Sequence, residues 1–176
     1  MIIEEVNNEN PHEHWRHVEC DGRVTVDFGC GRWEQVEHRD QSWPTTPEFL
    51  LEKGASEVYA FDIDGNEIEW YKNNVSTSKP QIIPIQKDLS NLDVFREIYF
   101  EYKPKAVKCD IEHNESFILQ LTDEEFASVD HYAIETHSDQ LQNLFLQRFE
   151  NLGYEIKAII HLVHANPMKV IFATKK

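Results

Sequence analysis

Carboxylates and imidazoles follow two short apolar runs in the second half of the sequence, and these side chains could move a proton. Asp110, Glu112 and His113 come after the first run, and Glu135 and His137 end the second. An unperturbed histidine titrates near neutral pH, so His137 and His113 are the candidate general bases for an acceptor hydroxyl. Asp110 could serve instead only if burial raised its pKa or a metal activated the acceptor.

The same part of the chain offers ligands for a metal ion. Asp110, Glu112 and Glu135 supply carboxylate oxygens, which suit Mg²⁺, Mn²⁺ or Ca²⁺. A divalent metal is therefore one expectation for this cluster. The alternative is structural: Asp110 and Glu112 alternate at the end of a strand, one in solvent and the other capping the next helix. Spacing alone fixes no ligand geometry, so both interpretations stay open.

These side chains need a framework of strands, and its clearest part is the stretch from Val24 to Gly31. Apolar, β-favouring residues alternate with polar ones and run into an acid and two glycines, Asp27, Gly29 and Gly31. In α/β folds a glycine-rich turn of this kind receives nucleotide-like ligands beyond the carboxyl end of the strand. The stretch predicts a ligand site at these three residues, although it could also be a turn alone.

Two further apolar runs end in an acid, Asp62 and Asp88. In nucleotide-binding α/β units the acid that ends the second strand bonds ribose hydroxyls, about 20 residues after the glycines. The connection to Asp62 is longer here. We expect Asp62 with its neighbour Ile63, and Asp88 with its neighbour Leu89, to line the cofactor site.

With these motifs the chain resembles the class I S-adenosylmethionine-dependent methyltransferases. The stretch around the candidate bases is similar to the fourth-strand motif of the FkbM type, Lys-x-Asp-x-Glu-Gly-x-Glu. The matching residues are Lys108, Asp110, Glu112 and Glu115, and His113 replaces the glycine. The segment from Ala133 to His137 resembles the fifth strand of that family.

The resemblance implies S-adenosylmethionine as the cofactor, with Asp62 on its ribose and Asp88 at its adenine. It implies a Rossmann-like α/β sandwich with a mostly parallel seven-stranded sheet, in the order 3-2-1-4-5-7-6. A C-terminal antiparallel hairpin ends that sheet, and helices cover both faces. The acceptor would be an oxygen of a sugar or another small molecule.

One domain over residues 1–176 is expected from the length. Residues 1–22 form a polar lead-in segment with one short helix, and 32–46 form a lid, a substrate loop or a mobile surface loop. Caps and periodicity predict the other elements. These are helices near 48–53, 65–74, 89–99 and 138–149, a loop and helix over 111–121, and a short helix that starts at 122. A final hairpin follows, whose strands, 154–163 and 168–174, flank a loop.

Composition and charge restrict the kinds of partner and the cellular location that we expect for this protein. The net charge is −15 and the Lys and Arg residues form no cluster, so we expect a small-molecule acceptor and no nucleic acid. No apolar run is long enough to span a membrane. Three scattered cysteines, Cys20, Cys30 and Cys109, fit no disulfide or zinc pattern and suggest a cytoplasmic location.

Two other function classes fit parts of the sequence. A non-catalytic cofactor- or partner-binding module is one, because His113 fills space that a glycine would leave open. A nucleotide-dependent oxidoreductase is the other, but the turn lacks a third glycine and little chain is left for a substrate domain.

Overall fold

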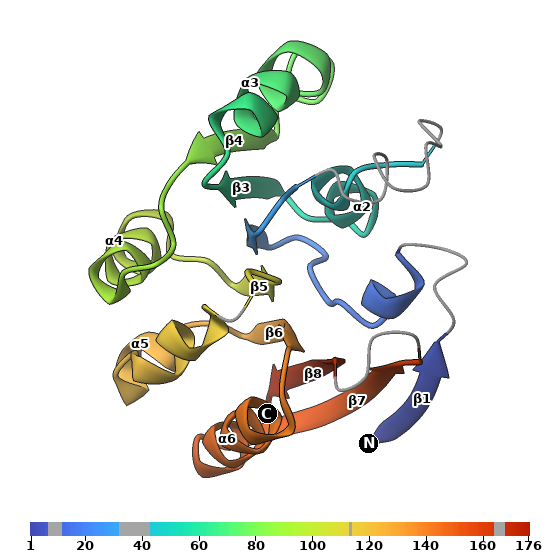
Figure 1. Ribbon diagram of the computed structural model, residues 1–176, viewed down its shortest axis with the longest axis vertical. Helices are drawn as coiled ribbons and strands as arrows, with labels where there is room; N and C mark the ends of the chain where they lie inside the picture. The colour runs from blue at the N-terminus through green and yellow to red at the C-terminus, as the bar shows by residue number, and fades with distance from the viewer. Residues whose placement is uncertain (7–11, 32–42, 113, 164–167) are drawn as a thin grey trace.

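A computed structural model describes residues 1–6, 12–31, 43–112, 114–163 and 168–176. An eight-stranded sheet forms its middle layer, in the order β1-β7-β8-β6-β5-β2-β3-β4 (Figure 1). Every neighbouring pair is parallel except the two that β8 makes with β6 and β7. The Rossmann-like class, the mostly parallel sheet and the antiparallel C-terminal hairpin are thus confirmed.

Seven of the strands are those that the sequence predicts, and they have the predicted order. Their bounds are β2 Val24–Phe28, β3 Glu57–Asp62, β4 Ile82–Gln86, β5 Ala106–Cys109, β6 His131–Thr136, β7 Tyr154–Leu162 and β8 Lys169–Lys175. All residues of β5 and β6 are buried, as expected for central strands covered on both faces.

The eighth strand corrects the prediction for the lead-in segment. Strand β1, Ile2–Val6, pairs in parallel with β7, with Ile2 opposite Ala158. The prediction missed it because only Val6 of its five residues is buried, so no hydrophobic alternation marks it. The short helix predicted in this segment is present as the 3₁₀ helix η1, Glu13–Trp15.

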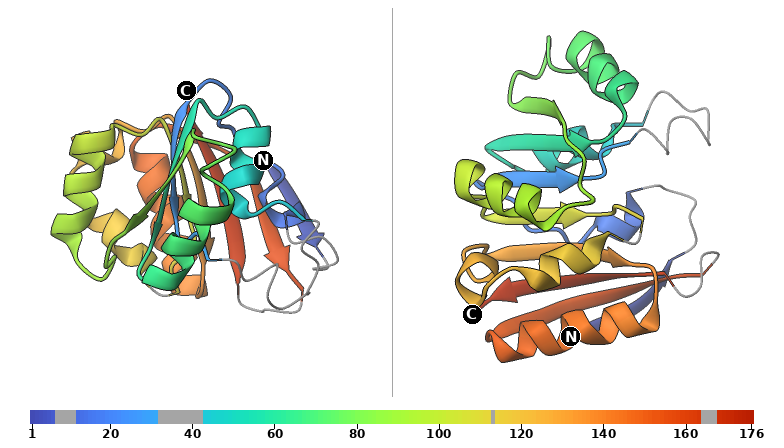
Figure 2. Two further views of the ribbon diagram at one scale, coloured as in Figure 1. Left: turned by 90° about the horizontal axis from the view of Figure 1, so that it is seen from above. Right: turned by 60° about the vertical axis from the view of Figure 1, so that its left-hand side comes forward.

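Helices cover both faces of the sheet, as predicted (Figure 2). On one face lie α2, Thr46–Glu52, α3, Gly65–Asn74, and η1 with the residues that directly follow it. On the other lie α4, Leu92–Tyr102, η2, Glu115–Gln120, α5, Asp123–Phe126, and α6, Asp139–Asn151. None of the helices in the described ranges has the length and apolarity that crossing a membrane requires.

Local capping explains where several helices begin. Asp64 accepts a hydrogen bond from the Asn66 amide, and Ser138 accepts one from the Leu141 amide, so α3 and α6 start where the sequence predicts. Thr45 and Glu48 form a capping box at the start of α2. The predicted lid over 32–46 lies largely outside the described residues, which resume at 43.

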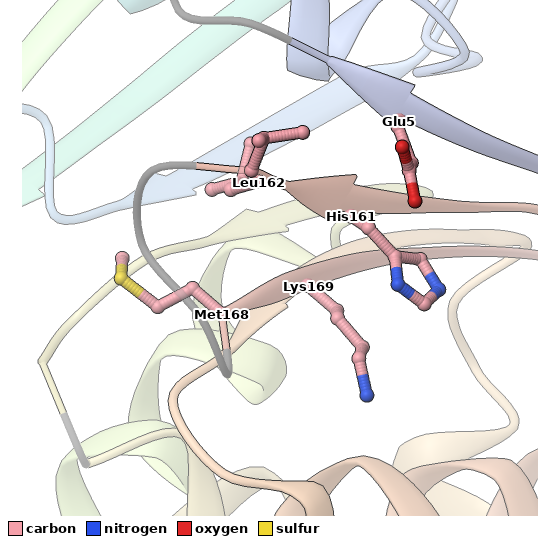
Figure 3. Close-up of a pocket in the computed structure, with 6 residues that line it drawn as sticks. Glu5, His161, Leu162, Met168 and Lys169 are labelled. Atoms are coloured by element: carbon pink, nitrogen blue, oxygen red, sulfur yellow. The ribbon is translucent and has the colours of Figure 1, made fainter.

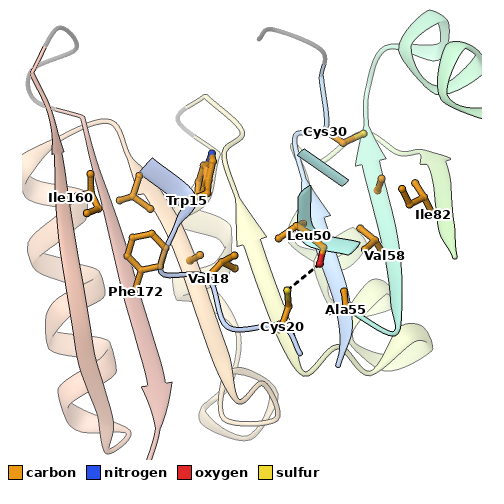
Figure 4. Packing of buried hydrophobic residues seen from close by; sticks show 14 of the residues in the cluster. Trp15, Val18, Cys20, Cys30, Leu50, Ala55, Val58, Ile82, Ile160 and Phe172 are labelled. Carbon is orange, nitrogen blue, oxygen red and sulfur yellow. Dashed lines mark hydrogen bonds between the residues drawn. The ribbon is translucent and has the colours of Figure 1, made fainter. Parts of the chain in front are cut away.

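The described residues that follow β1 in the lead-in segment, 12–22, pack on the same face of the sheet as α2. Trp15 and Val18 pack in one buried cluster with Ile160 of β7 and Phe172 of β8, and Cys20 donates a hydrogen bond to the Leu50 carbonyl of α2 (Figure 4). This packing brings Trp15 to the carboxyl end of the central strands, beside the candidate site.

Candidate functional site

The predicted functional residues gather at one edge of the sheet. Phe28 of β2 is paired with Phe61 of β3 and with Cys109 of β5, and Cys109 is paired with Ile134 of β6. Because these parallel strands end at the same level, the residues that follow them are neighbours. The edge therefore joins the glycine turn to the cluster of carboxylates and His137.

Backbone contacts hold the glycine turn tightly. The amides of Gly29 and Cys30 donate to the Phe61 carbonyl, at 3.0 and 3.2 Å. Gly29 has φ +80°, and a Cβ there would lie 1.8 Å from the Asp110 carbonyl oxygen. A Cβ on Gly31 would be 3.6 Å from Asp62 Oδ2. Only glycine permits Gly29's conformation and this close approach of two strand ends.

Asp27 lies beneath the turn and is fully buried, as is Lys108 of β5 except for 2% of its surface. Lys108 Nζ is 3.1 Å from Asp27 Oδ1 and donates to the Gly29 carbonyl at 3.0 Å. It also lies 4.9 Å from the centre of the Trp15 ring. Lys108 thus ties the turn to the strand, a role that sequence reasoning missed, although a lysine within an apolar strand was the available signal.

The cofactor residues predicted on β3 and β4 differ in accessibility. Asp62 Oδ1 accepts the Asp64 amide, burial raises the pKa of Asp62, and the neighbouring Ile63 side chain is 64% exposed. Asp88 is exposed and accepts the Ser90 amide, and hydrogen bonds from Ser90 lower its pKa. Leu89 is buried in the core. Asp62 and Ile63 are therefore better placed for a ligand than Leu89.

His137 forms the centre of the polar cluster, with its side chain only 5% exposed. Its Nδ1 lies 2.7 Å from Glu115 Oε1, and its Nε2 lies 3.5 Å from Glu112 Oε2, 3.8 Å from Glu135 Oε1 and 3.9 Å from Asp110 Oδ1. The structure thus unites Asp110, Glu112 and Glu135 with His137. The predicted base His113 lies outside the described residues.

The cluster holds more acids than nearby cations neutralise. Burial, together with Asp110, raises the pKa of Glu135 to about 8, and burial also raises that of Asp110. Burial lowers the pKa of His137, but Glu115 and the other carboxylates outweigh this and raise it to about 9. The carboxylates around His137 therefore favour the protonated form of its ring.

Glu115 is the second residue whose role sequence reasoning missed. It is fully buried at the start of η2, and its carboxylate orients the His137 ring. Glu112 is 77% exposed, so it is the solvated residue of the predicted alternating pair. It has φ +47°, a left-handed conformation uncommon outside glycine.

A cavity of about 230 Å³ lies apart from this cluster, against the ends of β1, β7 and β8 (Figure 3). It is lined by Glu5, His161, Leu162, Val163, Met168 and Lys169. None of the predicted site residues is among them.

Comparison with protein-family models finds no match, and neither does comparison with curated proteins. Solved structures do match. An rRNA methylase from Streptococcus thermophilus has a TM-score of 0.56 and 15% identity, over 94% of this chain and 95% of that one. The chain has the Rossmann-like methyltransferase fold.

Two more solved structures with the methyltransferase fold match the chain with similar TM-scores. A tRNA m1G37 methyltransferase from Methanococcus jannaschii has a TM-score of 0.57 and 21% identity, over 92% of this chain and 47% of that one. A Streptococcus pneumoniae protein in complex with S-adenosyl-L-methionine has a TM-score of 0.56 and 14% identity, over 89% and 67%. The finer FkbM-type assignment stays a prediction.

These neighbours overturn one prediction made from the sequence. The net charge of −15 led us to expect a small-molecule acceptor and no nucleic-acid partner. The neighbours are instead named for rRNA and tRNA methylation or processing, which points to nucleic acid. Net charge sums over the whole surface, so it is a weak guide to what one edge of the sheet binds.

Proposed function

We propose that the protein is an S-adenosylmethionine-dependent methyltransferase whose acceptor is RNA. The observation that carries the cofactor assignment is the tight Gly29–Gly31 turn with Asp62 beside it, at the carboxyl edge of a methyltransferase-fold sheet. A neighbour of the same fold is in complex with this cofactor. The acceptor class rests on the names of the neighbours.

The residues of the edge divide into binding and orienting groups. S-adenosylmethionine, when bound, supplies a sulfonium methyl group that is transferred by direct displacement. The Asp62 carboxylate would accept hydrogen bonds from the ribose hydroxyls, and the exposed Ile63 would pack against the base. Asp88 would contact the adenine edge. Asp27 would act through Lys108, by holding the turn in place.

Asp110 and His137 are the residues that we place against the acceptor. The Asp110 carbonyl touches Gly29, and its carboxylate lies 3.9 Å from His137 Nε2, so the acceptor would meet the methyl group beside the turn. His113 directly follows Glu112 in the sequence, and its predicted role as a base is kept as part of the proposal.

A titration of thermal stability with S-adenosylmethionine, S-adenosylhomocysteine and NAD tests the cofactor assignment. A ligand present at 100 times its Kd stabilises the native state by about 2.7 kcal/mol. We expect S-adenosylhomocysteine to stabilise the wild type and Asp62→Asn to lose most of this effect. Glu57→Gln is the matched control, because Glu57 lies at the opposite end of the same strand. Stabilisation by NAD alone, or by none of the three ligands, would overturn the proposal.

Transfer of a labelled methyl group to RNA tests the acceptor. We expect label from S-adenosylmethionine to enter total RNA and to be removed by ribonuclease. Fractionated tRNA and rRNA identify the acceptor class. Cofactor binding without ribonuclease-sensitive label would contradict an RNA acceptor and leave the cofactor assignment intact.

A further inference from the structure

We propose that Asp110, Glu135 and His137 together bind one divalent cation beside the glycine turn. This inference deepens the proposed function, because the cation would bind the acceptor oxygen. The three residues each offer one ligand atom, and these atoms lie within 4.8 Å of one another. The set joins His137 to two of the three carboxylates expected as ligands from the sequence, and it leaves out Glu112, whose side chain is largely exposed.

Glu135 is the first independent sign of a ligand. Its side chain is 97% buried at the end of β6, and no hydrogen bond to its carboxylate is made within the described part of the chain. His137 Nε2 lies 3.8 Å from Glu135 Oε1. An isolated buried carboxylate is costly, and buried charges are normally paired or coordinate a metal. The Glu135 carboxylate faces the same point as Asp110 and His137, where a cation would neutralise it.

The placement of the His137 ring is the second sign. Its Nδ1 lies 2.7 Å from Oε1 of the fully buried Glu115 carboxylate, so a ring proton is favoured on Nδ1. The other ring nitrogen, Nε2, then faces Asp110 and Glu135. Histidines that bind metals commonly donate their second ring nitrogen to a carboxylate, which fixes the ring and the tautomer. Glu115 would therefore be a positioning residue.

The spacing fits an ion of octahedral preference. Ligand atoms at about 2.1 Å from such an ion lie roughly 3 Å apart when adjacent and roughly 4 Å apart when opposite. Nε2 lies 3.9 Å from Asp110 Oδ1 and 3.8 Å from Glu135 Oε1, so small side-chain rotations suffice. Two carboxylates with one imidazole suit Mn²⁺, since carboxylates favour hard ions and imidazole favours transition metals.

A cation in this position selects the acceptor atom. It would lower the pKa of a coordinated hydroxyl, which for RNA means a ribose hydroxyl rather than a base nitrogen. The new carbon–oxygen bond forms as the carbon–sulfur bond breaks, and the electron pair of that bond stays on sulfur as a neutral thioether. The hydroxyl proton passes to the exposed Glu112 carboxylate and then to water.

Binding of Mn²⁺ to the full-length protein, freed of metals with a chelator, tests the site without an activity assay. Electron paramagnetic resonance of free Mn²⁺ and calorimetry would give the stoichiometry and Kd. We expect one ion per chain in the wild type, and at least a tenfold weaker Kd in Glu135→Gln and in His137→Gln. Glu124→Gln is the control, because Glu124 is exposed in α5 and lies outside the cluster. The Kd of this variant for Mn²⁺ should equal that of the wild type.

Folding of the variants is checked by chemical denaturation without metal. Glu135→Gln replaces a buried carboxyl group by a neutral side chain of the same size, so it should unfold at a denaturant concentration no lower than the wild type. If either variant fails to fold, Asp110→Asn replaces it, since that side chain is partly exposed. The proposal is overturned if neither Mn²⁺, Zn²⁺ nor Mg²⁺ binds at millimolar concentration, or if binding survives the substitutions. Neither result affects the S-adenosylhomocysteine titration, which tests the proposed function separately.

Discussion

Gly29 is the residue at which the backbone of the site has least freedom. It combines a positive φ of +80° with a position where any Cβ would overlap the Asp110 carbonyl. Gly153, after α6, has nearly the same φ, +76°, but no atom within 4 Å of an added Cβ. The two glycines therefore separate the cost of the backbone conformation from the cost of the close approach.

Replacing these glycines by alanine gives a prediction at the scale of single residues. Gly153→Ala should lower the free energy of unfolding by about 1–2 kcal/mol, the usual cost of the left-handed conformation. Gly29→Ala should lower it by about 3 kcal/mol or more, because the turn must also move away from β5. Urea denaturation measures both. Equal losses at the two positions would show that the contact with Asp110 has no energetic weight.

The positions of single site residues were predictable from the sequence in two cases. One is a glycine whose turn needs an unusual backbone conformation, and the other is an acid that directly follows an apolar strand. The glycine turn and the carboxylates after β3, β5 and β6 were recognisable for this reason. The partners that orient them were not, because Glu115 reaches His137 and Trp15 reaches Lys108 only through the tertiary fold. Leu89 shows the opposite error, since its position beside an acid suggested a ligand contact while its side chain packs in the core.

At the scale of elements, strand β1 is the least firmly attached part of the sheet by its side chains, because only one of its five residues is buried. Val6 is 3% exposed, whereas Ile3 on the same strand is 61% exposed. Glu4 adds ion pairs to Arg16 and His17 of the lead-in segment, but these are partly exposed and contribute little. The burial of Val6 and the hydrogen bonds to β7 therefore hold the strand.

Two aspartate substitutions on β1 test this attachment. Val6→Asp places an unpaired charge in the core and should release β1, so that amide hydrogens of β7 exchange faster than in the wild type. Ile3→Asp introduces the same charge at an exposed position and should leave exchange unchanged. Hydrogen exchange followed by mass spectrometry measures both. Unchanged protection of β7 in Val6→Asp would contradict the prediction.

Elements were predictable where capping and alternation coincide. Asp64, Ser138 and Thr122 marked the starts of α3, α6 and α5, and each side chain makes the expected cap. Strand β1 lacks such signals, since it lies at the sheet edge with only one residue buried. Its pairing depends on β7, at the other end of the sequence.

The charge of the whole molecule bears directly on an RNA acceptor. With 32 acidic and 17 basic side chains, the protein repels a polyphosphate at long range. Raising the salt from about 10 to 150 mM shortens the screening length from about 30 to 8 Å. Here, unlike for a basic RNA-binding protein, screening should favour the encounter.

We therefore expect kcat/KM for methyl transfer to RNA to rise by roughly two- to tenfold over this range of salt. Affinity for S-adenosylhomocysteine, measured in the same buffers, should stay constant because that ligand has little net charge. A steep loss of transfer with added salt would instead indicate a local basic surface that releases counterions from the RNA. At this scale the fold class was predictable from the order of strand and turn motifs, whereas the partner was not.

The pairing of β1 with β7 also affects the order in which the strands can join the sheet during synthesis. Ile2 pairs with Ala158, so β1 leaves the ribosome long before its partner strand is made. At 5–20 residues per second the wait is roughly 8 to 30 s. During synthesis the rest of the sheet can assemble from β2 onward while β1 has no neighbour. Of the eight strands, the one translated first therefore joins the sheet after most of the others.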